Sequence, residues 1–266
     1  MNHAAELLDR YELFLLDAYG VLVDGSGALA AATQFVGELK RLGKAVRVVT
    51  NDASRLEQTH ARRFQRLGFD LRAEEIVPSG LLLTDWVQAR GGPRCLVLGP
   101  PDSGAFVTRG GGSVVHPDQR GDFDAVVVGD ETGFALLEGV ERAANALIQR
   151  PELPRVVPNP DVVYPKGGGK VGLASSGVAA LIEQMVAERQ PDAPRFERLG
   201  KPRPELFLRA LDGSSRDEAV MLGDQPATDL MGAAAAGIDG ALVLTGVTPE
   251  PPEGCEARWL LPSLAL

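Results

Sequence analysis

The stretch Leu13-Phe14-Leu15-Leu16-Asp17 joins four consecutive apolar residues to a carboxylate. Such a short, continuous apolar run is typical of a buried strand in a parallel sheet. Two later runs have the same form and end at Thr50 and at Asp224. The carboxyl ends of parallel strands lie along one edge of a sheet, and ligands of open α/β sheets bind there. We therefore expect Asp17, Thr50 and Asp224 to share one site.

Strand-like and helix-like segments alternate along the chain, which predicts an α/β protein with largely parallel sheets. Several of the helical segments stop at a glycine, as helices commonly do. The expected strands are residues 13–16, 45–49, 95–98, 125–128, 156–159, 219–222 and 241–244. The expected helices are residues 30–42, 56–67, 81–89, 134–149, 172–189, 204–211 and 228–236. His60 falls in a polar helical stretch and is expected at the surface.

The composition bounds the size and the partners of the protein. A chain of 266 residues with 44% apolar content can bury a sizeable core, in one large domain or two unequal ones. Its net charge of −9 without a basic block disfavours binding to nucleic acids or anionic membranes. The N-terminus does not resemble a signal peptide, and no apolar run approaches the ~18 residues that span a bilayer. Two distant cysteines, Cys95 and Cys255, indicate a reducing compartment, so we expect a cytoplasmic protein.

The residue types at the expected sheet edge suit the transfer of a phosphoryl group. A carboxylate such as Asp17 can attack phosphorus and form an aspartyl-phosphate, which divides one difficult step into two. Clustered carboxylates repel each other and the substrate phosphate, so the site needs a hard divalent cation such as Mg²⁺. Lys201 would keep the nucleophile ionised and bind the phosphate, and Thr50 would donate a hydrogen bond to a phosphoryl oxygen. Asp229 lies five positions beyond Asp224 and would join the acidic cluster.

Four segments resemble, in order, the four motifs of the haloacid dehalogenase superfamily. They are Asp17-Ala18-Tyr19-Gly20-Val21-Leu22, Val49-Thr50-Asn51, Lys201-Pro202 and Gly223-Asp224-Gln225-Pro226-Ala227-Thr228-Asp229. Further segments resemble the NagD-like subfamily, which includes sugar, nucleotide, pyridoxal phosphate and phosphoglycolate phosphatases. These segments are residues 50–55, 75–80, 159–161 and 200–207. Together the segments extend over almost the whole chain.

The resemblance implies a Rossmann-like three-layer core with a parallel sheet, formed by residues 1–79 and 191–266. Residues 80–190 would form an inserted α/β cap of the C2 type, and relatives often dimerise through this cap. The function implied is a Mg²⁺-dependent phosphatase acting on a small phosphorylated metabolite. Its metal ligands would be Asp17, the backbone carbonyl of Tyr19 and Asp224. Asp229 would either bind the metal directly or contact one of these ligands. Its substrate-binding residues would be Thr50, Asn51, Asp52, Asn159, Asp161 and Lys201, and Asp17, Thr50 and Lys201 would carry the catalysis.

One position departs from the family pattern. The phosphatases of the family usually carry a second aspartate two residues after the nucleophile, which protonates the leaving group and then activates water. Here that residue is Tyr19, whose reference pKa of ~10 suits such proton transfer poorly near neutral pH. Losing this catalyst typically costs ~10²–10⁴-fold in rate. Asp24 could replace it, or the protein could be a weakened member that binds a phosphorylated ligand.

A third reading follows from Asp17-Ala18-Tyr19-Gly20, which also resembles the start of the 2-haloacid dehalogenases of the superfamily. Those enzymes use the same nucleophile on carbon and need no metal. The acidic pair Asp224 and Asp229 and the NagD-like segments argue against this reading.

Overall fold

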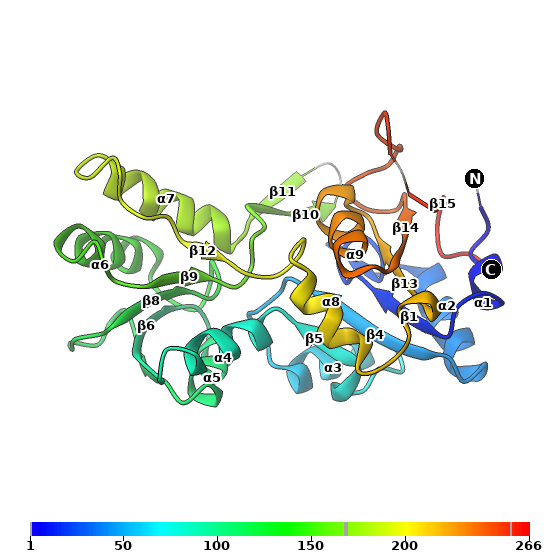
Figure 1. Cartoon of the computed structure of the whole chain (residues 1–266), viewed down its shortest axis with the longest axis horizontal. Helices are drawn as coiled ribbons and strands as arrows, with labels where there is room; N and C mark the ends of the chain where they lie inside the picture. The colour runs from blue at the N-terminus through cyan, green and yellow to red at the C-terminus, as the bar shows by residue number, and fades with distance from the viewer. Residues whose placement is uncertain (1, 168–169, 256) are drawn as a thin grey trace.

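Two parallel sheets lie side by side in the computed structural model, which describes residues 2–167, 170–255 and 257–266 (Figure 1). The larger sheet has the strand order β15-β14-β13-β1-β4-β5, and we call it and its helices the core domain. The smaller sheet has the order β12-β9-β8-β6-β7 and belongs to the cap domain, which lies at the left of Figure 1. The expected α/β fold, a Rossmann-like core with an inserted α/β cap, is confirmed.

The core domain is built from both ends of the chain. Its strands are β1 (Leu13–Leu16), β4 (Ala45–Thr50), β5 (Ile76–Pro78), β13 (Ala219–Gly223), β14 (Asp239–Val243) and β15 (Trp259–Leu261). Its helices are α1 (Ala5–Leu8), α2 (Ala30–Arg41), α3 (Glu57–Arg66), α8 (Pro204–Leu211) and α9 (Met231–Ala236), with short helical turns η1 (Ala73–Glu75), η2 (Arg216–Glu218) and η3 (Pro226–Leu230). A small hairpin, β2 (Val23–Asp24) with β3 (Gly27–Ala28), follows β1.

The cap domain comes from the middle of the chain. Its parallel strands are β6 (Arg94–Leu98), β7 (Ser113–Val115), β8 (Ala125–Val128), β9 (Arg155–Val157) and β12 (Glu197–Arg198). Its helices are α4 (Gly80–Gln88), α5 (Pro101–Arg109), α6 (Leu136–Gln149) and α7 (Ser175–Ala187). An antiparallel hairpin, β10 (Val163–Gly167) with β11 (Lys170–Leu173), precedes α7.

Strand β1 shows why the central strands are apolar without interruption. Leu13 and Leu15 pack into one hydrophobic cluster, whereas Phe14 and Leu16 pack into another on the opposite face of the sheet. Side chains of a strand alternate between faces, so a strand that is covered on both faces needs an apolar residue at every position. The four side chains are at most 2% exposed. Only the edge of the sheet is therefore left for polar groups.

One hydrophobic cluster continues from the core domain into the cap domain. It contains Leu15 of β1 and Phe207 of α8, and it extends through Leu83 of α4 and Phe106 of α5 to Val97 of β6. A second face of the cap sheet packs separately against α6 and α7. The shared cluster fixes how the two sheets meet beside the carboxyl ends of the core strands.

Three local expectations differ from the structure. The helix expected from residue 172 begins at Ser175, because residues 170–173 form β11 of the hairpin. Helix α5 was not expected, since the Gly- and Pro-rich run around it is typical of a loop; Pro101 instead occupies its first turn, where no backbone N–H is needed. His60 is buried rather than exposed, with its ring nitrogen Nε2 3.2 Å from the carbonyl oxygen of Asp52.

The boundary between the cap domain and the second part of the core domain, expected at residue 191, stays a prediction. Strand β12 (Glu197–Arg198) pairs with β9 in the cap sheet, so the chain leaves this sheet only after Arg198.

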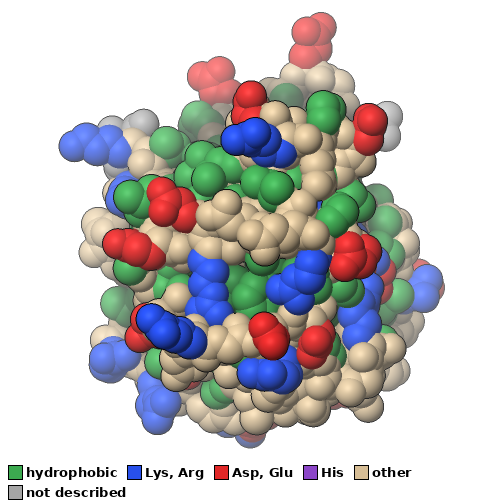
Figure 2. All heavy atoms as spheres, turned by 90° about the vertical axis from the view of Figure 1, so that its left-hand side faces the viewer, with side chains coloured by type: hydrophobic (Ala, Val, Ile, Leu, Met, Phe, Trp, Pro, Cys, Tyr) green, Lys and Arg blue, Asp and Glu red, His purple; other side chains and the backbone are tan. Residues whose placement is uncertain are grey.

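Charged side chains of both signs cover the exposed end of the cap domain. Figure 2 looks onto the end of the cap domain, where acidic and basic side chains are interspersed around apolar ones. No helix in the described part of the chain combines the length and the apolar content needed to cross a bilayer.

Candidate active site

Strand order brings the polar residues at the strand ends together. Strand β1 lies between β13 and β4, so Asp17, which follows β1, lies between Asp224 and Thr50 along the sheet edge. The three side chains are buried, with exposed fractions of 6%, 0% and 2% for Asp17, Asp224 and Thr50. The Asp17 N–H donates to the Leu222 carbonyl over 2.9 Å, which continues the ladder of β1 and β13. The backbone of Asp17 is thus fixed by the sheet itself.

Lys201 connects two of the acidic residues. Its ammonium Nζ lies 2.6 Å from Asp17 Oδ1 and 2.7 Å from Asp229 Oδ1, and all three side chains are buried. Burial alone would lower the pKa of Lys201, but the two carboxylates raise it well above its usual value. Lys201 therefore remains charged. An ammonium has three N–H donors, and the two carboxylates leave one for a phosphoryl oxygen.

Three carboxylates form a compact oxygen cluster. One oxygen from each of Asp17, Asp224 and Asp229 lies within 4.8 Å of the others. Asp224 Oδ2 accepts a hydrogen bond from the Val247 N–H at 2.6 Å, whereas its buried Oδ1 has no hydrogen-bond partner among the residues that the structure describes. Burial, followed by the charge of Asp229, raises the pKa of Asp224 to about 7. Burial also raises the pKa of Asp17, and the Lys201 ammonium counteracts this shift.

These observations fit a hard divalent cation. Oxygen donors in a small cluster are the ligands that Mg²⁺ prefers, and an unpaired buried carboxylate oxygen costs free energy unless a partner satisfies it. Asp224 Oδ1 is such an oxygen. The acidic triad can thus hold a metal ion, which would supply the partner that Asp224 lacks within the protein.

Two glycines let the chain approach Asp224 closely. A Cβ atom on Gly246 would lie 2.0 Å from Asp224 Oδ2, and one on Gly20 would lie 2.3 Å from the same oxygen. Gly20 also has a φ of 87°, a conformation that glycine adopts most readily. The Thr245 hydroxyl donates to the Gly20 carbonyl over 2.6 Å and ties the two loops together. An added methyl group at either glycine would displace the Asp224 carboxylate.

Asn51 links the core domain to the cap domain beside the acidic cluster. Its Oδ1 accepts a hydrogen bond from the Lys201 N–H at 2.8 Å, and its Nδ2 donates to Asp161 Oδ1 over 3.1 Å. Asn159 Oδ1 in turn accepts from the Asp161 N–H at 2.9 Å. Burial raises the pKa of Asp161. The NagD-like segment at residues 159–161 therefore meets the Asn51 and Lys201 segments at one place.

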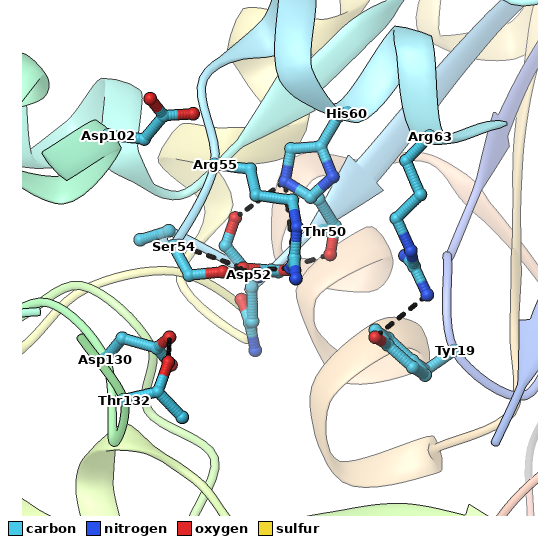
Figure 3. Close-up of polar contacts among 12 residues, drawn as sticks. Tyr19, Thr50, Asp52, Ser54, Arg55, His60, Arg63, Asp102, Asp130 and Thr132 are labelled. Atoms are coloured by element: carbon cyan, nitrogen blue, oxygen red, sulfur yellow. Dashed lines mark hydrogen bonds and ion pairs between the residues drawn. The ribbon is translucent and has the colours of Figure 1, made fainter. Parts of the chain in front are cut away.

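Asp52 is held by its own loop rather than left free. Its Oδ1 accepts hydrogen bonds from the backbone and hydroxyl of Ser54, and its Oδ2 lies 2.7 Å from Arg55 Nη1 (Figure 3). The Asp52 N–H donates to Thr50 Oγ1 over 3.2 Å. Burial would raise the pKa of Asp52, but His60, Arg55 and the Ser54 hydrogen bonds lower it below its usual value. Asp52 is therefore an anion that orders the loop after β4.

The hydroxyl group of Tyr19 is held by Arg63. Its hydroxyl accepts a hydrogen bond from Arg63 Nη2 at 3.0 Å, and the Arg63 guanidinium lies 5.1 Å from the centre of its ring (Figure 3). Burial raises the pKa of Tyr19 above its usual value. Asp24, the other residue considered for this role, is engaged elsewhere: its Oδ1 accepts hydrogen bonds from Ser26 and Gly27 in the β2–β3 turn. Asp24 is also absent from the wall of the cavity described next.

A cavity of about 230 Å³ opens above Asp17 between the two domains. Its wall includes eight of the residues selected from the sequence: Asp17, Tyr19, Thr50, Asn51, Asp52, Asn159, Asp161 and Lys201. Asp224 and Asp229 lie buried behind this wall. The sequence reading missed a cap loop that completes the wall, formed by Asp130, Glu131 and Thr132. The strand-end pattern could have found this loop, because it directly follows β8 and Gly129.

Two family models match the chain and cover more than half of it. Residues 14–111 match a haloacid dehalogenase-like hydrolase, and residues 198–265 match a HAD-hydrolase-like family. An acid sugar phosphatase of Staphylococcus aureus is 27% identical over 244 residues, which are 91% of this chain and 89% of that protein.

Solved structures share the fold over nearly the whole chain. A possible sugar phosphatase of Cytophaga hutchinsonii has a TM-score of 0.89 and 28% identity, with 100% of this chain and 98% of that chain covered. NagD from Escherichia coli K-12 has the same fold with a TM-score of 0.75 and 23% identity, covering 96% of this chain and 98% of that one. A protein described as a putative nagD protein is 25% identical with a TM-score of 0.80, and 96% of each chain is covered. The two matched segments and these likenesses place this chain in the haloacid dehalogenase superfamily, among its NagD-like members.

Proposed function

We propose that the protein is a Mg²⁺-dependent phosphatase that hydrolyses a small phosphorylated metabolite through a phosphorylated Asp17. The observation that carries this proposal is the buried acidic triad, in which Lys201 contacts Asp17 and Asp229 while Asp224 Oδ1 has no partner within the described part of the chain. The relatives support it, since they include an acid sugar phosphatase and a possible sugar phosphatase. The cavity of about 230 Å³ beneath the cap suits a small metabolite.

In the proposed reaction an Asp17 carboxylate oxygen attacks phosphorus, and the bond from phosphorus to the leaving-group oxygen breaks. The free N–H of Lys201 and the Thr50 hydroxyl would hydrogen-bond the phosphoryl oxygens, and the leaving oxygen takes up a proton from solvent. Water then attacks phosphorus in the aspartyl-phosphate and gives a proton back to solvent, and the bond from phosphorus to the Asp17 oxygen breaks, which releases phosphate and restores the Asp17 carboxylate. Asp17, Asp224, Asp229 and the Tyr19 carbonyl would hold Mg²⁺, which when bound offsets the negative charge of the phosphoryl group.

Phosphate release from p-nitrophenyl phosphate and from a panel of phosphorylated metabolites tests this proposal. The assay is run with Mg²⁺ and with EDTA. We expect turnover with Mg²⁺ that EDTA abolishes and fresh Mg²⁺ restores. Measurable binding of phosphorylated compounds without metal-dependent turnover of any of them would favour the alternative, a protein that only binds its ligand. The structure and the relatives give no support to the expectation of weakened activity.

Replacing Tyr19 by phenylalanine separates the hydroxyl from the backbone carbonyl of this residue. Because the hydroxyl is bound to Arg63, we expect Tyr19→Phe to keep kcat within about threefold of the wild type, far from the ~10²–10⁴-fold loss of a missing acid–base catalyst. Steady-state kinetics over a range of pH measures this. A fall of a hundredfold or more, on the order of that catalytic contribution, would show that the Tyr19 hydroxyl transfers the proton after all.

Binding of Mg²⁺ should depend on pH. The carboxyl of Asp224 in the metal-free protein has a pKa raised to about 7 by burial and the neighbouring Asp229, so a proton competes with the cation below this pH. We expect the dissociation constant for Mg²⁺ to fall about tenfold for each pH unit from roughly pH 5.5 to 7 and then to level off. Calorimetric titration measures it. A constant affinity over this range would contradict the assignment of Asp224 as a ligand.

The cytoplasmic location and a homodimer formed through residues 80–190 remain predictions. Sedimentation analysis of the full chain, at concentrations used in the assays, tests the second.

A further inference from the structure

The cavity has a phosphoryl end and a second end that would receive the rest of the substrate. Asp17, Thr50 and Lys201 form the first end at the edge of the core sheet. The loop that follows β4, with Asp52 and Arg55, and the cap loop of residues 130–132 form the second. In Figure 3, Asp130 and Thr132 lie on the cap side of the cavity, across from Ser54 and Arg55.

Negative charge predominates at this second end. Three carboxylates, those of Asp52, Asp130 and Glu131, surround a single guanidinium, that of Arg55. The guanidinium is already engaged, because Arg55 Nη1 lies 2.7 Å from Asp52 Oδ2 and 3.0 Å from Ser54 Oγ. The charge of Asp130 also acts on this guanidinium, so Arg55 is shared between Asp52 and Asp130. The other cation that lines the cavity, Lys201, contacts Asp17 and Asp229, so the acids at the second end outnumber the cations available to them.

The pKa of Glu131 indicates that burial and the neighbouring acids together disfavour an anion at this end. Burial and the adjacent Asp130 carboxyl raise the pKa of Glu131 to about 8, and Asp52 adds to this shift. Asp130 Oδ2 also accepts a hydrogen bond from the Thr132 hydroxyl at 2.8 Å, which holds the loop in place. A region where even one resident carboxyl keeps its proton near neutral pH is a poor place for another anion.

We infer that Asp130 and Glu131 make the active site select phosphate esters whose leaving group is an uncharged polyhydroxyl compound, and reject those that carry a carboxylate or a second phosphate. This inference rests on the proposed phosphatase function and names its substrate class. The oxygens of the two acids accept hydrogen bonds from hydroxyl groups, whereas the charge of Asp130, together with that of Glu131 when it is ionised, repels an anion at the same place. For two charges a few ångströms apart near a protein surface, the repulsion corresponds to about 10- to 100-fold in kcat/KM.

Glycerol 3-phosphate and 3-phosphoglycerate test the inference, because they differ only in that a carboxylate replaces a hydroxymethyl group. Each is measured as a substrate and as a competitor of p-nitrophenyl phosphate hydrolysis, with saturating Mg²⁺ near pH 7.5. We expect the wild type to prefer glycerol 3-phosphate by about 10- to 100-fold in kcat/KM, or in inhibition constant. In the double variant Asp130→Asn/Glu131→Gln the preference should shrink to about threefold or less, since the cap loop then carries no negative charge.

Glu138→Gln provides the matched control. Glu138 is an exposed acid in the first turn of α6 in the same domain and does not line the cavity, so this variant should keep the wild-type preference. Thermal unfolding verifies that all variants fold. Equal values for the two esters in the wild type, or a preference unchanged by the double variant, would overturn the inference. A wild type that hydrolyses no ester with Mg²⁺, p-nitrophenyl phosphate included, would instead refute the phosphatase function itself.

Discussion

Asp17→Asn should reduce phosphatase turnover by at least about 10⁴-fold, because the amide cannot act as the nucleophile that forms the covalent intermediate. The substitution preserves the shape of the side chain and its backbone bond to Leu222. Lys201 keeps its second contact, at 2.7 Å to Asp229 Oδ1, so the ammonium stays paired. The protein should therefore fold while losing activity. Initial rates with p-nitrophenyl phosphate and Mg²⁺ measure the effect.

Trapping of the intermediate makes this prediction specific. Acid quenching of the wild type during turnover, followed by peptide mass spectrometry, should place a phosphoryl group on the peptide that contains Asp17, and the variant should carry none. Asp24→Asn is the matched control, seven residues along the chain, and its side chain is occupied in the β2–β3 turn. We expect that variant to stay within about threefold of the wild type, as surface changes usually do. An Asp17→Asn protein with one percent or more of wild-type activity, roughly a hundredfold loss, would exclude Asp17 as the nucleophile.

Asp224→Asn should abolish the effect of Mg²⁺ on both activity and stability. The substitution removes a negative charge from the triad and keeps an oxygen that can accept from the Val247 N–H. We expect the rise in Tm caused by Mg²⁺ to disappear and turnover to fall by about 10³-fold, because a ligand that binds only the folded state stabilises it through that binding. Thermal unfolding against Mg²⁺ concentration and initial rates measure the two effects.

Without metal the same substitution should stabilise the fold. The pKa of Asp224 is about 7 in the folded protein, compared with 3.8 ordinarily, so the folded state binds the proton more tightly than the unfolded chain. The wild type therefore loses this contribution as pH rises from about 4 through 7, whereas asparagine has no proton to lose. In EDTA near pH 8 we expect the variant to be more stable by about 1 kcal/mol, with the gain shrinking toward pH 5.

Asp217→Asn is the control for this comparison. Asp217 is exposed just before β13, at the opposite end of the strand that leads to Asp224. This variant should keep the wild-type response to Mg²⁺ and the wild-type dependence of Tm on pH. If Asp224→Asn still gained stability from Mg²⁺ as the wild type does, Asp224 would not be a metal ligand.

Local sequence patterns were sufficient for much of the core domain. The apolar run of β1 followed by Asp17, and the similar runs before Thr50 and Asp224, indicated buried parallel strands with polar residues at their ends. These patterns are informative because a strand covered on both faces must be apolar throughout, so its first polar residue marks the edge of the sheet.

The sequence of the cap domain was harder to interpret than that of the core domain. Helix α5 contains Gly104 and begins with Pro101, and its helical state depends on packing of Phe106 against α4 and the sheets.

By itself, the sequence determined the fold class, the alternation of strands and helices, and the set of acidic residues with Lys201 that follow the core strands. Tertiary structure alone decided which of these groups touch. It gave Lys201 two carboxylate partners, left Asp224 Oδ1 without a hydrogen-bond partner among the described residues, and turned the Tyr19 hydroxyl toward Arg63. It also placed Asp130 and Glu131 at the far end of the cavity. Contacts between distant segments depend on how loops and domains pack, and side-chain periodicity within one element carries no information about that packing.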